Sequence, residues 1–204
     1  MQKMIIATMS LVFVMIGQTA SAVFAQEQQV FERPTYVVGD TWEYVNRNGE
    51  TRTFKIIEVS EAGFVSIQSD KDGEKRVAFD RDGNRIDPGW RYLPFPLHVG
   101  KKWKFEVVPT ERNPSGSTLV IDARVTKLTT VKTKGGTFDA LVIESCWNRK
   151  DNPSIQGCGP TFWYAPKVKH MVKRESTGAG APGYYTDYEL VSFTPAGQQI
   201  TAQK

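Results

Sequence analysis

The sequence of 204 residues predicts an all-β protein, an antiparallel meander that forms a curved, half-barrel or barrel-like sheet. Three observations support this fold class. Apolar and polar residues alternate with a period of two in many short segments, as in strands with one buried face. Asn-Gly, Asp-Gly and Gly-Gly pairs separate these segments and supply the positive φ angles that tight hairpins require. Helical periodicity is nearly absent after the N-terminal segment.

Residues 1–25 have the pattern of a secretory signal peptide, because Lys3 precedes an apolar run that ends in small residues. Cleavage after Ala22 or after Ala25 fits the small-x-small rule, and the polar sequence from Gln26 favours the second position. The run is shorter than the roughly 20 residues that span a bilayer, and no cysteine directly follows it. We therefore expect an exported, periplasmic or secreted protein, without a lipid anchor or a transmembrane span in the mature chain.

Residues 26–94 are predicted to form a first β-rich half. Its opening strand lies in V-G-D-T-W-E-Y-V, where Trp42 and Tyr44 share one face. Further strands are predicted at residues 53–59, 64–69 and 75–80. The acidic stretches D-K-D-G-E and D-R-D-G-N lack the ligand spacing of a calcium loop, so we interpret them as hairpin turns.

The opening phrase returns in V-G-K-K-W-K-F-E-V at residues 99–107. Gly39 and Gly100 allow the chain to turn, and Trp42 and Trp103 anchor the following strand by burying a large aromatic ring. Residues 87–98 contain several prolines, which cannot donate to a sheet ladder, so this segment is predicted to cross between two halves. The repeat is compatible with duplication of a strand-rich half and equally with reuse of a good strand start.

Residues 95–194 are predicted to form the second β-rich half. Strands are predicted at residues 119–128 and 138–147, followed by T-F-W-Y, V-K-H-M-V-K-R-E and Y-E-L-V-S-F. The segment 138–147 is apolar on both sides, which predicts a central strand. Residues 195–204 are polar and are expected to form a flexible tail.

The chain has two cysteines, Cys146 and Cys158. An exported chain with an even, small number of cysteines favours a disulfide, and the intervening N-P-S-I-Q-G can turn the chain back. A free thiol or a metal site is the competing interpretation. Metal binding would need more histidine and cysteine ligands than this chain offers, so we expect the disulfide and no metal.

Charge and motifs exclude several functions. The net charge of +4 is well mixed, and the basic run at residues 167–174 alternates with apolar residues. This alternation favours one polar face of a strand over a polyanion or anionic-lipid patch, and we expect no nucleic acid partner. No G-x-S-x-G elbow, phosphate loop or dinucleotide motif is present. We therefore predict no catalytic residue and no cofactor, and the sequence favours a protein without enzymatic activity.

Aromatic residues gather in the second half of the chain. Most of them are expected to pack in the core or to pair on the sheet surface. The alternative is a groove in a curved sheet that binds a ligand or a partner's segment. The candidate binding residues are Trp147, Trp163, Tyr164, His170 and Tyr185, although His170 also fits a simple sheet position beside two valines.

Three segments carry a resemblance to a known group. Residues 131–144 and 161–175, with F-P-L-H-V-G-K-K-W at residues 95–103, resemble phrases of poorly characterised exported bacterial proteins, TapB-like or of unknown function. The resemblance covers about residues 95–193. It implies an antiparallel, half-barrel-like sheet in the cell envelope, and it carries over no catalytic residue. Lys167 and Lys169 stand where glycines are expected, so a glycine-dependent turn is in question there.

These observations support three hypotheses about function. The first is an exported cell-envelope protein that binds an apolar, lipid-like or glycan ligand, or an envelope protein, on a curved sheet without catalysis. The second is a hydrolase acting on exported glycan, which needs two carboxylates that face one cleft. The third is a purely structural accessory domain.

Overall fold

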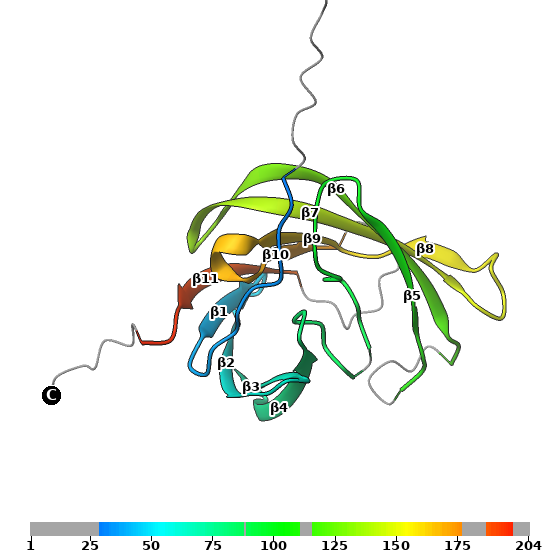
Figure 1. Ribbon diagram of the computed structural model, residues 1–204. Helices are drawn as coiled ribbons and strands as arrows, with labels where there is room; N and C mark the ends of the chain where they lie inside the picture. The colour runs from blue at the N-terminus through cyan, green and yellow to red at the C-terminus, as the bar shows by residue number, and fades with distance from the viewer. Residues whose placement is uncertain (1–28, 88, 111–115, 177–186, 198–204) are drawn as a thin grey trace, which may run out of the picture.

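The structure, a computed structural model, describes residues 29–87, 89–110, 116–176 and 187–197. It confirms the predicted fold class, because the strands of these residues form one antiparallel sheet that curves without closing (Figure 1). Within the described ranges no helix is long and apolar enough to cross a membrane. The predicted signal peptide, Tyr185 and residues 198–204 lie outside the described residues.

The first part of the sheet is a meander of hairpins with turns at Gly49 and Gly73, both at positive φ. Its strands are β1 (Thr41–Asn46), β2 (Thr51–Val59), β3 (Gly63–Asp70) and β4 (Gly73–Asp80). Each strand pairs with the next in antiparallel register. The acidic stretches lie at the β3–β4 turn and just after β4, which agrees with their interpretation as turns.

The described residues of the second part form seven strands and one short 3-10 helix. They are β5 (Lys102–Val107), β6 (Leu119–Thr133), β7 (Gly136–Arg149), β8 (Gln156–Cys158), β9 (Thr161–Ala165), η1 (Pro166–Val168), β10 (His170–Glu175) and β11 (Tyr188–Thr194). The order across the sheet is β4-β3-β2-β1-β11-β10-β9-β7-β6-β5, and β8 extends the pairing along β7. The last strand, β11, therefore lies between β1 and β10 and joins the two parts (Figure 1).

The two repeated phrases adopt the same local geometry. Gly39 and Gly100 have φ angles of 101° and 85°, which are favourable only for glycine. In each turn the residue after the glycine donates its N–H to the carbonyl three residues earlier, at 3.0 Å for Asp40 and 3.2 Å for Lys101. Both glycines also donate to a later strand, Gly39 to Ile56 at 2.9 Å and Gly100 to Val125 at 2.8 Å.

The tryptophans of the two phrases differ in burial. Trp42 is fully buried and donates Nε1–H to the carbonyl of Val168 at 2.7 Å. Trp103 is only partly buried and donates to the carbonyl of Arg91 at 2.8 Å. Both rings begin a strand as predicted, but Trp42 is a buried member of a core cluster, whereas Trp103 packs against the edge of two others as a partly buried residue.

The sheet buries apolar side chains on both faces. In β7, Phe138 and Ala140 belong to one cluster, whereas Leu141 and Ile143 belong to another, which makes β7 a central strand as expected. The cluster around Leu141 is completed by the crossover segment, in particular by Leu97, which is fully buried. The chain's own side chains therefore cover this apolar face of the sheet.

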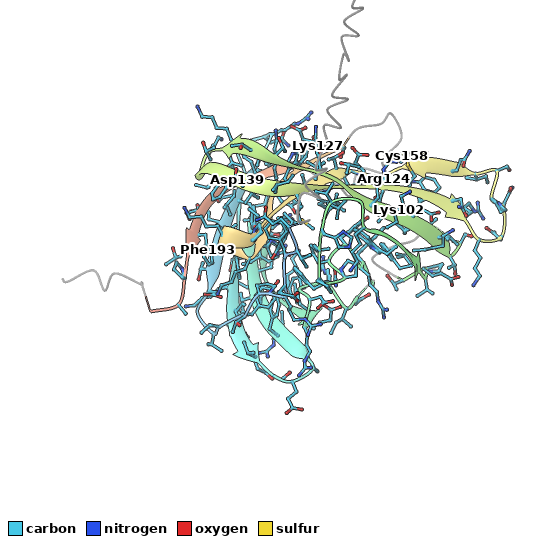
Figure 2. The ribbon with its side chains drawn as sticks, turned by 45° about the horizontal axis from the view of Figure 1, so that its top comes forward. Lys102, Arg124, Lys127, Asp139, Cys158 and Phe193 are labelled. Atoms are coloured by element: carbon cyan, nitrogen blue, oxygen red, sulfur yellow. A yellow bond between two sulfur atoms is a disulfide. The ribbon has the colours of Figure 1, made fainter. Side chains whose placement is uncertain are left out.

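A disulfide joins Cys146 and Cys158, which lie opposite each other on β7 and β8. The surrounding outer face of β5, β6 and β7 carries cross-strand ion pairs, Lys104 with Asp122 at 3.1 Å and Arg124 with Glu144 at 3.0 Å. Figure 2 places the labelled Arg124 and Cys158 over this part of the sheet. This face is polar and paired, and its neighbouring charges neutralise each other.

Candidate functional site

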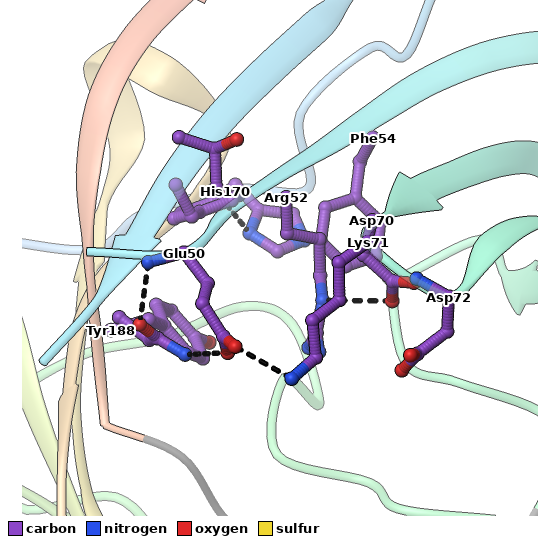
Figure 3. A pocket seen from close by; sticks show the side chains of 11 residues that line it. Glu50, Arg52, Phe54, Asp70, Lys71, Asp72, His170 and Tyr188 are labelled. Atoms are coloured by element: carbon purple, nitrogen blue, oxygen red, sulfur yellow. Dashed lines mark hydrogen bonds and ion pairs between the residues drawn. The ribbon is translucent and has the colours of Figure 1, made fainter. Parts of the chain in front are cut away.

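A small cavity of about 80 Å³ lies where the β1–β2 hairpin, the β3–β4 turn, β10 and β11 meet (Figure 3). It combines aromatic side chains with a charged margin. The lining residues are Tyr44, Asn46, Glu50, Thr51, Arg52, Phe54, Asp70, Lys71, Asp72, His170 and Tyr188. The cavity has room for several water molecules or part of a small ligand.

Four rings form the aromatic part of the cavity. Tyr44 is central, with ring centroids 5.0 Å from Tyr188, 5.8 Å from Phe54 and 5.9 Å from His170. The contacts to Tyr188 and Phe54 are edge-to-face, an arrangement that aromatic pairs prefer. The rings hold one another in place, so this wall of the cavity is preorganised.

Period-two alternation explains why these rings meet. Trp42 and Tyr44 share one face of β1, and Phe54 of β2 is registered opposite Trp42 on the same face. Tyr188 begins β11 and is registered opposite Asn46 at the end of β1. His170 begins β10 directly after the turn that follows η1.

Ion pairs between the hairpins form the margin. Lys71 in the β3–β4 turn donates to Glu50 in the β1–β2 hairpin at 2.6 Å. Arg52 lies 3.5 Å from Asp70. The hydrogen bond from Lys71 lowers the pKa of Glu50, and the amide of Gln68 lowers the pKa of Asp70. Both carboxylates therefore remain ionised at neutral pH.

His170 connects the aromatic wall to the backbone. Its Nδ1 lies 2.7 Å from the hydroxyl of Tyr44, which also lies 3.0 Å from the carbonyl oxygen of Met171. Burial lowers the pKa of His170 to about 4, although part of its surface remains accessible from the cavity. The imidazole is therefore neutral at pH 7. Burial also raises the pKa of Tyr44, whose hydroxyl stays protonated.

The residues nominated from sequence do not gather in one place. Of the four that the structure describes, His170 lines the cavity. Trp163 and Tyr164 are consecutive residues of β9 and pack in different clusters, Tyr164 beside Phe95 with 5.5 Å between ring centroids. Trp147 packs in a third cluster, at the end of the sheet that carries β5. Tyr185 lies outside the described residues.

Most of the cavity was not nominated from the sequence. The sequence gives Tyr44 only a structural place on the same face as Trp42, and it does not single out Arg52 or Tyr188. The available signal was the charged, glycine-containing hairpin N-R-N-G-E-T-R directly after an aromatic strand. That signal is equally typical of an ordinary solvent-exposed turn.

The carboxylates of the cavity differ from those of a glycosidase. A glycosidase needs one carboxylic acid whose pKa is raised so that it can donate a proton. Here the pKa values of Glu50 and Asp70 are lowered instead. No group of three or more histidine, cysteine or acidic residues that could hold a metal ion occurs among the described residues.

Comparisons with known sequences found no match. No protein-family model matches the chain, and no curated protein matches it. The name TapB-like, suggested by the resemblance of residues 95–193, is therefore not confirmed.

Three solved structures are similar to the chain at low identity. An exported protein with a YmcC-like fold from Bacteroides fragilis is 14% identical with a TM-score of 0.43, covering 81% of this chain and 100% of that one. The lipoprotein YmcC from Escherichia coli is 15% identical with a TM-score of 0.45, covering 78% and 86%. A lipoprotein from Parabacteroides distasonis is 11% identical with a TM-score of 0.39, covering 80% and 97%. Likeness at this level carries no functional information for this chain.

Proposed function

We propose that this chain is an exported protein of the cell envelope that binds a small ligand, or a terminal group of an envelope molecule, without catalysing a reaction. The observation that carries the proposal is the cavity between the hairpins, where an aromatic wall faces an ionised margin. Pockets of this composition bind ligands through apolar contact and orient them through a few polar groups. The signal-peptide pattern of residues 1–25 supports export.

The structure favours a polar ligand over a long apolar chain. The apolar face over β7 is covered by Leu93 and Leu97 of the crossover segment, both buried. The remaining cavity is small and bordered by the charged side chains of Glu50, Arg52 and Lys71. A lipid tail would have to leave these charges without water, which is costly.

The two alternative functions, a glycan hydrolase and a purely structural domain, explain fewer features of the cavity. A glycan hydrolase is disfavoured because the carboxylates at the cavity are held in their ionised form by Lys71 and Gln68. A purely structural role would give no reason for a preformed aromatic cavity with an accessible histidine. Binding uses both features.

Native mass spectrometry of the protein purified from the envelope of its own host tests the proposal. We expect a co-purifying small molecule and an N-terminus at Val23 or Gln26. The variant Phe54→Ala should lose the bound molecule, because it removes one ring of the cavity wall. The matched control Phe193→Ala, a partly buried phenylalanine outside the cavity, should retain it. Protein that carries no ligand and acquires none from an envelope extract would overturn the proposal.

A further inference from the structure

The protons of the Tyr44–His170 pair can be assigned from its hydrogen bonds. The Tyr44 hydroxyl has one proton and two close partners, the carbonyl oxygen of Met171 at 3.0 Å and Nδ1 of His170 at 2.7 Å. A carbonyl oxygen can only accept, so the Tyr44 proton goes to Met171. Nδ1 of His170 must then donate its own proton to the Tyr44 oxygen. The neutral imidazole is held as the Nδ1–H tautomer.

This tautomer leaves Nε2 of His170 as a bare hydrogen-bond acceptor. His170 lines the cavity, and no described residue donates a hydrogen bond to Nε2. A ligand in the cavity should therefore offer a donor at this position.

Arg52 supplies the complementary group. Its Nε is buried and lies 3.5 Å from Oδ2 of Asp70, an ion pair without a hydrogen bond, whereas the side chain as a whole is 41% exposed and lines the cavity. The other N–H groups of the guanidinium can donate to a ligand oxygen in the cavity. A hydroxyl group is the simplest group that donates to Nε2 and accepts from an arginine N–H.

The charges around the cavity favour a neutral ligand. Glu50 is paired with Lys71, and Asp70 is paired with both Arg52 and Lys75. Asp72 also lines the cavity, so the three anionic side chains Glu50, Asp70 and Asp72 balance these three cations. Neither an anion nor a cation would therefore gain a large net attraction. The rings of Phe54 and Tyr188 offer apolar contact beside these polar groups.

We infer that the cavity binds one edge of a neutral, hydroxyl-bearing ring, a sugar residue, with a hydroxyl that donates to Nε2 of His170 and accepts from Arg52. A sugar ring combines hydroxyl groups with apolar C–H faces, which matches the polar and aromatic walls. The cavity of about 80 Å³ suits part of a single ring, such as the end of a glycan. This inference rests on the proposed function, because it names the ligand class of the same cavity.

The experiment is an NMR titration of the full mature protein with ¹⁵N-labelled imidazole groups. The probes are glucose, galactose and mannose, with inorganic phosphate and decanoate as the anionic and apolar comparisons. We expect the Nδ1–H tautomer in the free protein, and saturable shifts of the His170 nitrogens with at least one sugar. His170→Phe should weaken that binding about tenfold, as expected for one lost hydrogen bond. The matched control Tyr164→Phe, outside the cavity, should leave it unchanged.

The outcomes separate the inference from the proposed function. An Nε2–H tautomer in the wild-type protein would overturn the inference even if His170→Phe failed to fold. Saturable binding of phosphate or decanoate, but of none of the sugars, would support a ligand-binding cavity and overturn the inference that its ligand is a sugar. Absence of sugar binding also overturns the inference. If, in addition, the protein takes up nothing from an envelope extract, the proposed function fails as well.

Discussion

At the scale of single residues, His170 is the side chain whose chemistry depends most on its surroundings. The sequence placed it in a strand between apolar neighbours, where a neutral histidine is tolerated. The structure adds that its Nδ1 lies 2.7 Å from the hydroxyl of Tyr44 and that burial lowers its pKa. We infer that this residue, which fits an ordinary sheet position in the sequence, is the hydrogen-bond acceptor of the cavity.

His170 predicts a pH-dependent stability. Well above pH 6.5, the usual pKa of histidine, its imidazole is neutral in both the folded and the unfolded state. As the pH falls, the unfolded state takes up the proton first, since the folded-state pKa is about 4. The loss between pH 7 and pH 5 should be on the order of 2 kcal/mol. Urea unfolding at pH 7 and pH 5 measures this loss in the free energy of unfolding. The variant His170→Phe should show a much smaller loss between the two pH values. An equal loss in this variant would contradict the assignment.

Lys169 stands where the resembling sequences lead us to expect a glycine. Its backbone has a φ of 60°, the left-handed region that favours glycine, which is the residue expected there. Its Nζ lies 2.8 Å from Asp40, whose carboxylate is buried and also accepts the N–H of Ala196 at 3.0 Å. The ion pair compensates for the unfavourable backbone. Lys167 lies within η1.

Replacing Lys169 should separate the contribution of its ion pair with Asp40 from the cost of its left-handed backbone. Lys169→Ala leaves the buried carboxylate of Asp40 without its cation and keeps the backbone strain, so we expect a loss of about 3 kcal/mol. Lys169→Gly also loses the cation but relieves the backbone, and should be about 1 kcal/mol more stable than the alanine variant. Urea denaturation of both variants provides the comparison. Equal stability of the two would argue against strain at this position.

At the scale of elements, the phrase repeated at residues 38–45 and 99–107 begins a strand in both places, β1 and β5. Each copy turns at a glycine, bonds to a later strand through that glycine, and then inserts a tryptophan. The later strands also correspond, because the pairing shifts by one residue directly after Ile56 in β2 and directly after Val125 in β6. This correspondence supports a structural repeat of β1–β3 in β5–β7, which we propose as the basis of the two halves.

The turn glycines should be sensitive to substitution in both copies of the phrase. Gly39→Ala and Gly100→Ala force a side chain into a positive φ, and each should lower stability by about 1–2 kcal/mol. A Cβ at Gly39 would only reach ordinary contact with the Cβ of Ala196 at 3.4 Å, and one at Gly100 would meet nothing within 4 Å, so the backbone angle causes the loss in both. Thermal unfolding measures the loss, with the exposed Val99→Ala as a neutral control. A tolerated alanine at Gly100 would show that the turn is not required.

At the scale of the whole molecule, the two parts share a core. Trp42 and Ile56 of the first part lie in one cluster with Phe138, Val172 and Leu190 of the second. The C-terminal strand β11 pairs with β1 and thereby continues the sheet across the boundary. The parts at residues 26–94 and 95–194 are therefore bound together by burial and by pairing.

A fragment of residues 26–94 should not fold alone. Its strands would expose the apolar face that Phe138, Val172 and Leu190 cover in the intact chain. A two-dimensional NMR spectrum of the fragment should lack dispersion, whereas the intact protein should unfold in one transition. A dispersed spectrum of the fragment would establish the first part as an independent domain.

The strands could be predicted because their signals, apolar–polar alternation and turn glycines, lie within short segments of the sequence. Alternation around Trp103 and the glycines of the hairpins report on one strand or one turn at a time, and these elements are present in the structure. The same local signals placed Trp163 and Tyr164 together as binding candidates, but consecutive strand residues point to opposite faces. A cluster of aromatic residues in the sequence therefore does not define a cluster in space.

The amino-acid pattern alone predicts an all-β chain, a phrase repeated at residues 38–45 and 99–107, and a signal peptide at residues 1–25. Tertiary structure decides where a ligand could bind. The cavity takes Tyr44 from β1, Phe54 from β2, His170 from β10 and Tyr188 from β11. These strands meet because β11 inserts between β1 and β10, a pairing between distant segments of the chain. Alternation reports which face of a strand is buried and contains no information about which distant strand lies beside it.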